Sequence, residues 1–218
     1  MCLSAEVNFA ASAVIGAVGI ATLTHARHPR EVLFAAMPLL FALHQFVEGF
    51  VWLGLDGTIG ETARDQSAFL FLLYAQGLLP FLMPLSVLLL EDIAWRRGIL
   101  LGLTALAAAF SLYMTWGVLS EPVSCSIQNR SIAYSNPVTE KAWTGYVYIL
   151  VTCGALVMSG FPVIRWFGIL NLVGLTVVLI VRSYSFTSVW CLYAAIVSVT
   201  LYWQFRAGHV RRKAAVAA

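Results

Sequence analysis

Residues 33–54 read LFAAMPLLFALHQFVEGFVWLG, an apolar stretch that is interrupted by three polar side chains, His44, Gln45 and Glu48. A helix needs about 20 apolar residues to cross the hydrocarbon core of a bilayer, and this stretch is long enough. Its apolar residues run continuously, whereas a strand of a membrane barrel would alternate apolar and polar positions. The stretch therefore predicts a transmembrane helix that carries a polar site.

The composition of the whole chain agrees with this interpretation. Of 218 residues, 61% are hydrophobic and 11% are charged, whereas about a quarter of the residues in a soluble domain are charged. Polar surface is too scarce to cover a water-soluble globule, so lipid is the expected solvent. The basic residues are scattered in short loops, so we expect membrane lipids and not nucleic acid as partners.

Six further stretches are apolar and long enough to cross a bilayer. We predict an all-α integral membrane bundle of seven transmembrane helices, which forms one domain over residues 1–218. Breakers such as Asp56-Gly57 separate the stretches, and Gly160 and Pro162 divide the fifth from the sixth. The predicted spans are about 8–24, 33–54, 68–90, 98–119, 143–160, 162–181 and 186–205.

The distribution of Lys and Arg predicts the orientation, because cytoplasmic loops carry an excess of both. With the N-terminus outside, the cytoplasmic segments hold Arg27, Arg30, Arg96, Arg97, Arg165, Arg206, Arg211, Arg212 and Lys213. The external segments then hold Arg64, Arg130, Lys141 and Arg182. We therefore expect a bacterial inner-membrane protein with a basic cytoplasmic tail at 206–218 and a polar external loop at 120–142 that caps the external mouth.

His44 and Glu48 are the residues most suited to carry chemistry. Charge at membrane depth is costly, so Glu48 indicates a functional site, and the spacing of four residues places His44 on the same helical face. Met37, Phe41 and Trp52 extend this face, and Gln45 lies beside it. Imidazole and carboxylate groups bind divalent metals, and an imidazole also binds haem iron. A purely structural pair and a proton path are the alternatives.

Other polar groups are predicted in the external half of the bundle. At about 1.5 Å per residue, Gln76, Trp190 and Cys191 lie close below the external ends of their helices, and Arg182 ends the sixth. Cys2 would add a thiol at the external N-terminus, with a free amine if Met1 is removed. A disulfide among Cys2, Cys125 and Cys191 is the alternative to a metal site.

Two motifs resemble an uncharacterised family of bacterial multi-helix membrane proteins. They are the start Met1-Cys2-Leu-Ser4-Ala5 and the segment His44-Gln45-x-x-Glu48-Gly49-x-x-Trp52, and the later segment Ser188-x-Trp190-Cys191 is also similar. The resemblance implies a shared seven-helix plan and draws attention to Cys2, His44, Gln45, Glu48, Trp52, Trp190 and Cys191. It implies no activity.

The sequence thus predicts a membrane protein whose outward-facing polar site binds a metal, haem or a small ligand. The candidate metal ligands are Cys2, His44, Glu48 and Cys191, and the other candidate ligand-binding residues are Gln45, Gln76, Trp52, Trp190 and Arg182. One alternative is a membrane enzyme with Cys2 or Cys191 as nucleophile, His44 as base and Glu48 as the orienting carboxylate. Another is a transporter or proton-conducting bundle in which Glu48 titrates.

Overall fold

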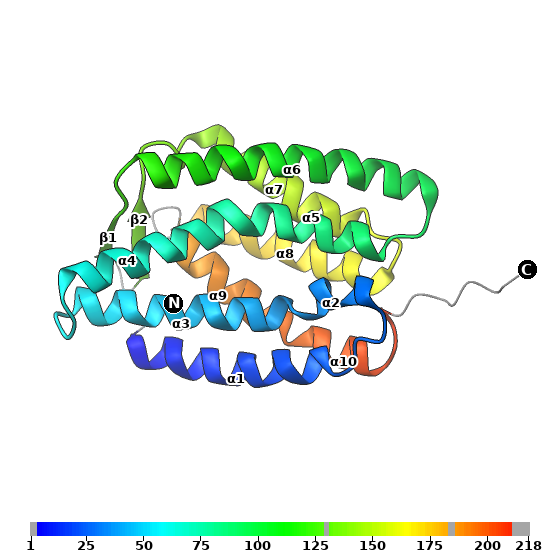
Figure 1. Cartoon of the computed structure of the whole chain (residues 1–218), viewed down its shortest axis with the longest axis horizontal. Coiled ribbons are helices and arrows are strands. Elements are labelled where there is room, and N and C mark those ends of the chain that lie inside the picture. Colours follow the sequence, from blue (N-terminus) through cyan, green and yellow to red (C-terminus); the bar gives the residue numbers. More distant parts are fainter. Residues whose placement is uncertain (1–3, 129–130, 183–185, 211–218) are drawn as a thin grey trace, which may run out of the picture.

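The computed structural model describes residues 4–128, 131–182 and 186–210, with only the backbone of 178–182, 186, 187, 189–191 and 194. Antiparallel helices and one short hairpin make up this part of the chain (Figure 1). The first half consists of α1 (Ala5–Leu23), α2 (Pro29–Ala35), α3 (Met37–Leu55), α4 (Glu61–Leu72), the π-helix η1 (Leu73–Leu78), α5 (Leu79–Leu90) and α6 (Ala94–Ser120). The second half consists of β1 (Ser124–Gln128), β2 (Ser131–Ser135), α7 (Ala142–Val157), α8 (Pro162–Arg182), α9 (Phe186–Ser198) and α10 (Thr200–Arg206).

Each predicted apolar stretch lies on one helix or on consecutive helices, so the helical fold class is confirmed. In the described ranges, four helical segments are long and apolar enough to cross a membrane: Ala5–Leu23, Pro29–Leu55, Glu61–Leu90 and Ala94–Ser120. These four segments indicate a membrane protein. The third begins seven residues before the predicted start at 68, because α4 opens with a polar turn that contains Arg64 and Asp65.

The second predicted span is divided into α2 and α3 by a proline. Pro38 has no N–H to donate to the carbonyl of Phe34, and its ring clashes with that carbonyl in a continuous helix. The chain therefore ends α2 at Ala35 and restarts with Pro38 in the first turn of α3.

A proline also accounts for the π-helical turn of η1, which the sequence analysis did not predict. Pro80 lies at the start of α5, where it would clash with the carbonyl of Gln76 in an ideal helix. The wider turn over Leu73–Leu78 relieves this contact. Such turns are frequent at functional sites, and this one carries Tyr74 and Gln76.

Helices α1 and α3 pack closely against each other. Gly19 lies directly against the backbone of Leu39, and Phe9 lies against Gly49. Between these two contacts, the Ser12 hydroxyl donates to the carbonyl of Ala42 over 2.8 Å. Small residues on α1 thus let it pack closely along the length of the site-bearing helix, as small residues do in membrane helices.

The predicted external loop at 120–142 contains the antiparallel hairpin β1–β2, so the fold is not purely helical. Cys125 pairs with Tyr134 across the two strands, and Ser126 pairs with Ala133. Ser131, Ile132 and Ala133 of β2 are buried, whereas most of β1 is exposed. The first part of β2 is therefore packed in the interior, whereas β1 is the outer strand of the hairpin.

The two ends of the bundle differ in their turns (Figure 1). The start of α1, the α3–α4 turn and the hairpin lie at one end, whereas the α5–α6 turn, the α7–α8 turn and α10 lie at the other. At the second end the buried carboxylate of Glu91 accepts hydrogen bonds from three backbone N–H groups, those of Asp92, Ile93 and Gly160. Glu91 therefore ties the α5–α6 turn to the α7–α8 turn.

Candidate functional site

His44, Gln45 and Glu48 all lie inside the bundle. Their exposed fractions are 3%, 0% and 0%, and the apolar residues of the same helix face are buried with them, namely Met37, Phe41 and Trp52. The predicted shared face of His44 and Glu48 is thus turned toward the protein interior. The neighbours that pack against α3 are α1, α4 and α9.

Aromatic rings surround His44. Its imidazole stacks on Phe71 with 3.9 Å between ring centroids and 16° between planes, and Tyr74 lies 4.6 Å away at 39°. Phe71 also stacks on Tyr134 of the hairpin at 4.4 Å and 12°. One ring face has room for one stacked ring at these distances, so Phe71 lies between His44 and Tyr134. A neutral imidazole has one N–H and one nitrogen lone pair, and both lie in the ring plane, so stacking on the ring face engages neither nitrogen.

Tyr134 also contacts Glu48. Its hydroxyl donates to Glu48 Oε1 over 3.4 Å, which is long for an O–H···O hydrogen bond. The sequence analysis missed Phe71, Tyr74 and Tyr134 as neighbours of the site. Phe71 and Tyr74 are two of many aromatic residues in apolar helices, and Tyr134 lies in a segment that the sequence predicts to be a loop, so no local pattern identifies them.

Several buried polar atoms in this region have no hydrogen-bond partner in the described ranges. They are both ring nitrogens of His44, both amide atoms of Gln45, Nε1 of Trp52 and Oε1 of Gln76. Leaving such an atom unsatisfied costs about 1–3 kcal/mol, and native proteins satisfy most of them with protein groups or ordered water. The site therefore offers a set of donors and acceptors for another molecule.

Asn8 is a further polar residue on the inner face of α1 that the sequence analysis did not single out. It is 1% exposed, its Nδ2 donates to the carbonyl of Ser4 over 3.2 Å, and its Oδ1 has no described partner. The contacts of Ser12 with Ala42 and of Phe9 with Gly49 fix the register of the two helices. They place Asn8 on α1 at about the level of Gln45–Gly49 on α3.

The remaining predicted site residues fall partly outside the described residues. Cys2 is outside them, and only the backbone is described for Arg182, at the end of α8, and for Trp190 and Cys191 in α9. Among the described side chains, no three His, Cys, Asp or Glu residues come together as a metal site. Cys125 and Cys153 are free thiols, so the disulfide considered for Cys125 is not formed.

The reactivity of the Cys125 thiol tests whether this residue of β1 is partly buried in the folded protein. Burial raises the pKa of Cys125, and the nearby guanidinium of Arg64 offsets this only in part. We expect alkylation of Cys125 in the folded protein to be slower at pH 8 than in the denatured chain, where a cysteine titrates near about 8.5. The alkylation rate of the folded protein should continue to rise with pH after the rate of the denatured chain has reached its plateau. Peptide mass spectrometry after timed labelling measures both rates, and identical pH profiles would contradict the burial of this thiol.

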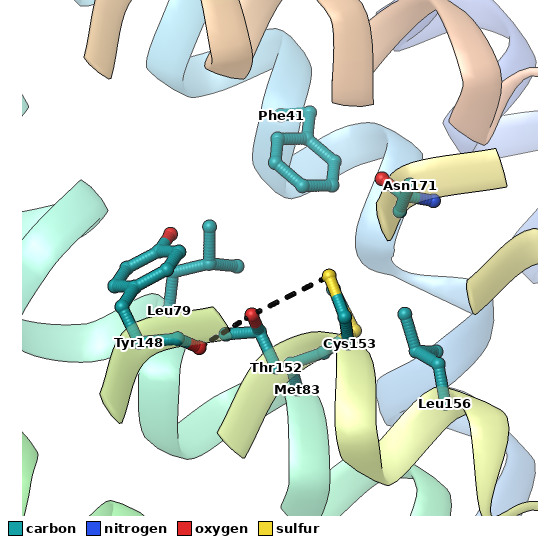
Figure 2. A pocket seen from close by; sticks show the side chains of 8 residues that line it. All are labelled: Phe41, Leu79, Met83, Tyr148, Thr152, Cys153, Leu156 and Asn171. Carbon is teal, nitrogen blue, oxygen red and sulfur yellow. Dashed lines mark hydrogen bonds between the residues drawn. The ribbon is translucent and has the colours of Figure 1, made fainter. Parts of the chain in front are cut away.

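A small cavity lies beside the site, between α3, α5, α7 and α8 (Figure 2). Its volume of about 10 Å³ suits one water molecule. Figure 2 shows Phe41, Cys153 and Asn171 facing it, and Thr152 donates to the carbonyl of Tyr148 over 2.7 Å. The complete lining consists of Phe41, Leu79, Met83, Tyr148, Thr152, Cys153, Leu156 and Asn171. This cavity is too small for an organic ligand.

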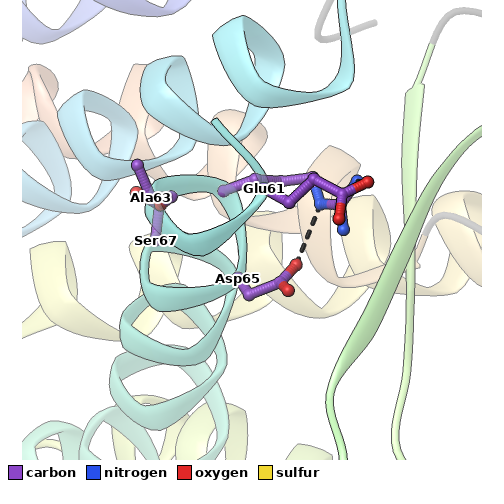
Figure 3. A network of polar contacts seen from close by, with 5 residues as sticks. Glu61, Ala63, Asp65 and Ser67 are labelled. Carbon is purple, nitrogen blue, oxygen red and sulfur yellow. Dashed lines mark hydrogen bonds and ion pairs between the residues drawn. The ribbon is translucent and has the colours of Figure 1, made fainter. Parts of the chain in front are cut away.

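The charged network on α4 is a surface feature and not part of the site (Figure 3). Arg64 Nε lies 2.9 Å from Asp65 Oδ1, and its Nη1 lies 4.0 Å from Glu61 Oε1. Both carboxylates are mostly exposed, and exposed ion pairs contribute little to stability. The network lies in the polar first part of α4, before the buried apolar residues of this helix begin at Ala68.

The comparisons with known proteins identify a family but no activity. The family described as "Family of unknown function (DUF6629)" matches residues 1–217. No curated protein and no solved structure matches the chain. Any function must therefore be inferred from the geometry of the site.

Proposed function

The chain belongs to the family of unknown function DUF6629, and we propose that it is a plasma-membrane protein that binds a small polar ligand or a metal ion in an outward-facing site. In this proposal the seven helical segments cross the inner membrane of a bacterium, with the N-terminus outside and the C-terminus in the cytoplasm. His44, Gln45 and Glu48 form the centre of the site.

The observation that carries the proposal is the burial of His44 and Gln45, whose four polar side-chain atoms have no hydrogen-bond partner among the described residues. Two adjacent buried residues whose polar atoms have no described hydrogen-bond partner would together reduce the stability of the fold by several kcal/mol if no other molecule bound them. A purely structural pair would be expected to bond to its neighbours, as Glu31 and Glu91 do through backbone N–H groups. A bound species that both donates and accepts hydrogen bonds would remove the cost.

The charge distribution supports the proposed orientation. Six of the seven exposed carboxylates lie at the end of the bundle with the hairpin, namely Glu6, Asp56, Glu61, Asp65, Glu121 and Glu140, and the seventh, Asp92, lies at the opposite end. At the opposite end Glu31 and Glu91 are buried, and Arg27, Arg30, Arg97 and Arg206 are exposed. A basic end is expected on the cytoplasmic side, which would place the hairpin, and Tyr134 next to Glu48, toward the outside.

A metal ion and an organic ligand are distinguished by direct analysis of the purified protein. The native protein, His44→Ala and Gln45→Leu are compared by elemental analysis, absorption spectroscopy and native mass spectrometry. Leu43→Ala is the matched control, because Leu43 is on the same helix but 57% exposed. We expect a stoichiometric metal, or a bound mass that is not a lipid, in the native protein and in Leu43→Ala, with its loss in both site variants. A Soret band would identify haem.

The outcome that would overturn the proposal is equally direct. If the native protein, purified under mild conditions, carries neither a metal nor a bound small molecule, the buried polar groups are satisfied by water alone. The same conclusion would follow if a bound species were retained in both His44→Ala and Gln45→Leu.

A further inference from the structure

Tyr134 covers the site from the hairpin side. Its ring stacks on Phe71 at 4.4 Å, and its hydroxyl reaches Glu48 Oε1 at 3.4 Å. Phe71 in turn stacks on His44. A single residue of β2 thus contacts both the carboxylate of Glu48 and the Phe71 ring that stacks on His44, although it lies 86 positions away from Glu48 in sequence.

The hairpin is anchored at one point that is separate from the site. Asn136, just after β2, is fully buried, and its Nδ2 donates to the carbonyl of Gly117 over 3.2 Å. Its Oδ1 accepts from the backbone N–H groups of Val138 and Thr139. These bonds fix the base of the hairpin to the end of α6 without involving Tyr134.

The rest of the hairpin is held mainly by apolar contacts. Ile132 is fully buried in a cluster with Val51, Trp52 and Ala68, and Ala5 of α1 completes it. Ser124, Ser126 and Ile127 of β1 are exposed. Opening of the hairpin would cost the contacts of β2 with α9 and of Ile132 with its cluster. It would break no helix, because the hairpin joins the bundle through its base and one buried strand.

We propose that the β1–β2 hairpin is a lid over the site and that Tyr134 is the residue that closes it. The ligand of the proposed function would enter from this end of the bundle when Tyr134 leaves Phe71 and Glu48 and the hairpin pivots near Asn136. The role of the lid rests on the proposed function, because it assumes a ligand. The opening of the hairpin does not, and it is measured without any ligand.

The stack contributes more to closure than the hydroxyl does, because the hydroxyl contact is long. Removal of the ring in Tyr134→Ala should therefore raise the open population by about tenfold. Tyr134→Phe keeps the ring and should raise it by no more than about threefold. This difference separates a lid that is closed by packing from one that is closed by the hydrogen bond.

The experiment places a thiol beneath the hairpin. Val51→Cys is a small change at a fully buried position in the cluster of Ile132. The full-length protein is embedded in lipid nanodiscs and treated with a charged methanethiosulfonate reagent, and the rate at residue 51 is followed by peptide mass spectrometry. The background variants are Tyr134→Ala, Tyr134→Phe and Ile127→Ala, the last being a matched control on the exposed face of β1.

The lid requires faster labelling at residue 51 with Tyr134→Ala, by about tenfold, and little change with Tyr134→Phe or Ile127→Ala. The native thiol of Cys125, which pairs with Tyr134 across the hairpin, gives a second reading in chains without Val51→Cys. If Tyr134→Ala speeds the labelling of Cys125 but not of residue 51, only the local packing of the hairpin has changed. If Tyr134→Ala changes the labelling rate of neither thiol, Tyr134 does not hold the hairpin closed. Either result overturns the lid. A ligand analysis that finds nothing bound, combined with faster labelling of residue 51, would reject the proposed function and leave the lid intact.

Discussion

Replacement of Gly19 by alanine should push α1 away from α3 and destabilise the protein by about 1–3 kcal/mol. A Cβ atom at Gly19 would lie 2.5 Å from the backbone nitrogen of Leu39 and 2.7 Å from its Cα. Backbone atoms cannot move aside as the end of a flexible side chain can, so the two helices must separate. Because α3 carries His44, Gln45 and Glu48, the site should be disturbed as well.

Gly16→Ala is the matched control for this prediction. The position lies one turn away on the same face, and a Cβ there would meet the Cβ of Ala42 at 3.5 Å, an ordinary contact. Its stability should stay within about 0.5 kcal/mol of the native protein or rise slightly, because alanine favours helix over glycine. Thermal or denaturant unfolding in the same detergent compares the three proteins. Equal losses in both variants would contradict the prediction, because the close approach of the Leu39 backbone distinguishes position 19 from position 16.

The second large effect is expected for Glu91→Ala, which should lower the free energy of unfolding by about 2–4 kcal/mol. The side chain is 2% exposed and its oxygens accept from Gly160 N–H at 2.5 Å, Ile93 N–H at 2.9 Å and Asp92 N–H at 3.1 Å. Alanine leaves three backbone donors without their acceptor. The α7–α8 turn would then be held by Arg96, which donates to the carbonyls of Met158 and Ser159.

Two further variants make the result at Glu91 specific. Glu91→Gln keeps the shape and one acceptor oxygen and should lose less than Glu91→Ala, whereas Asp92→Ala removes an exposed neighbouring carboxylate and should change little. Thermal or denaturant unfolding again measures the stability of each variant, and the rate of proteolysis at the α7–α8 turn is an independent measure. A Glu91→Ala protein as stable as Asp92→Ala would show that water replaces the carboxylate at no cost.

The three buried carboxylates have different partners, and this comparison supports the assignment of the site. Glu31 closes a capping box at the start of α2 and accepts from Arg27 N–H at 2.9 Å. Glu91 binds three backbone N–H groups. Glu48 lies in the middle of a helix, where backbone N–H groups are already used, and it accepts a hydrogen bond from Tyr134 of β2, which is distant in sequence. Glu31 and Glu91 therefore have local structural roles, whereas Glu48 belongs to a polar cluster that several elements assemble.

Much of the helical arrangement could be predicted from sequence. Long apolar stretches predict helices because a buried backbone in lipid must satisfy its hydrogen bonds internally. The spacing of four residues predicts that His44 and Glu48 share a face because an α-helix repeats every 3.6 residues. The break before Pro38 and the wide turn before Pro80 also follow from the sequence in principle, since proline removes a donor and clashes one turn back, but the length of an apolar stretch alone does not reveal them.

The sequence by itself determined that the chain is helical and rich in apolar segments, and that a polar stripe runs along residues 44–48. These properties follow from local composition and from the period of the helix. Only the tertiary structure decided that Phe71 lies between His44 and Tyr134, that Tyr134 reaches Glu48, and that Asn8 lies at about the level of Gly49 on α3. These contacts join residues that are tens of positions apart, and no helical or strand period relates them. They depend on how the helices pack and on where the hairpin folds back.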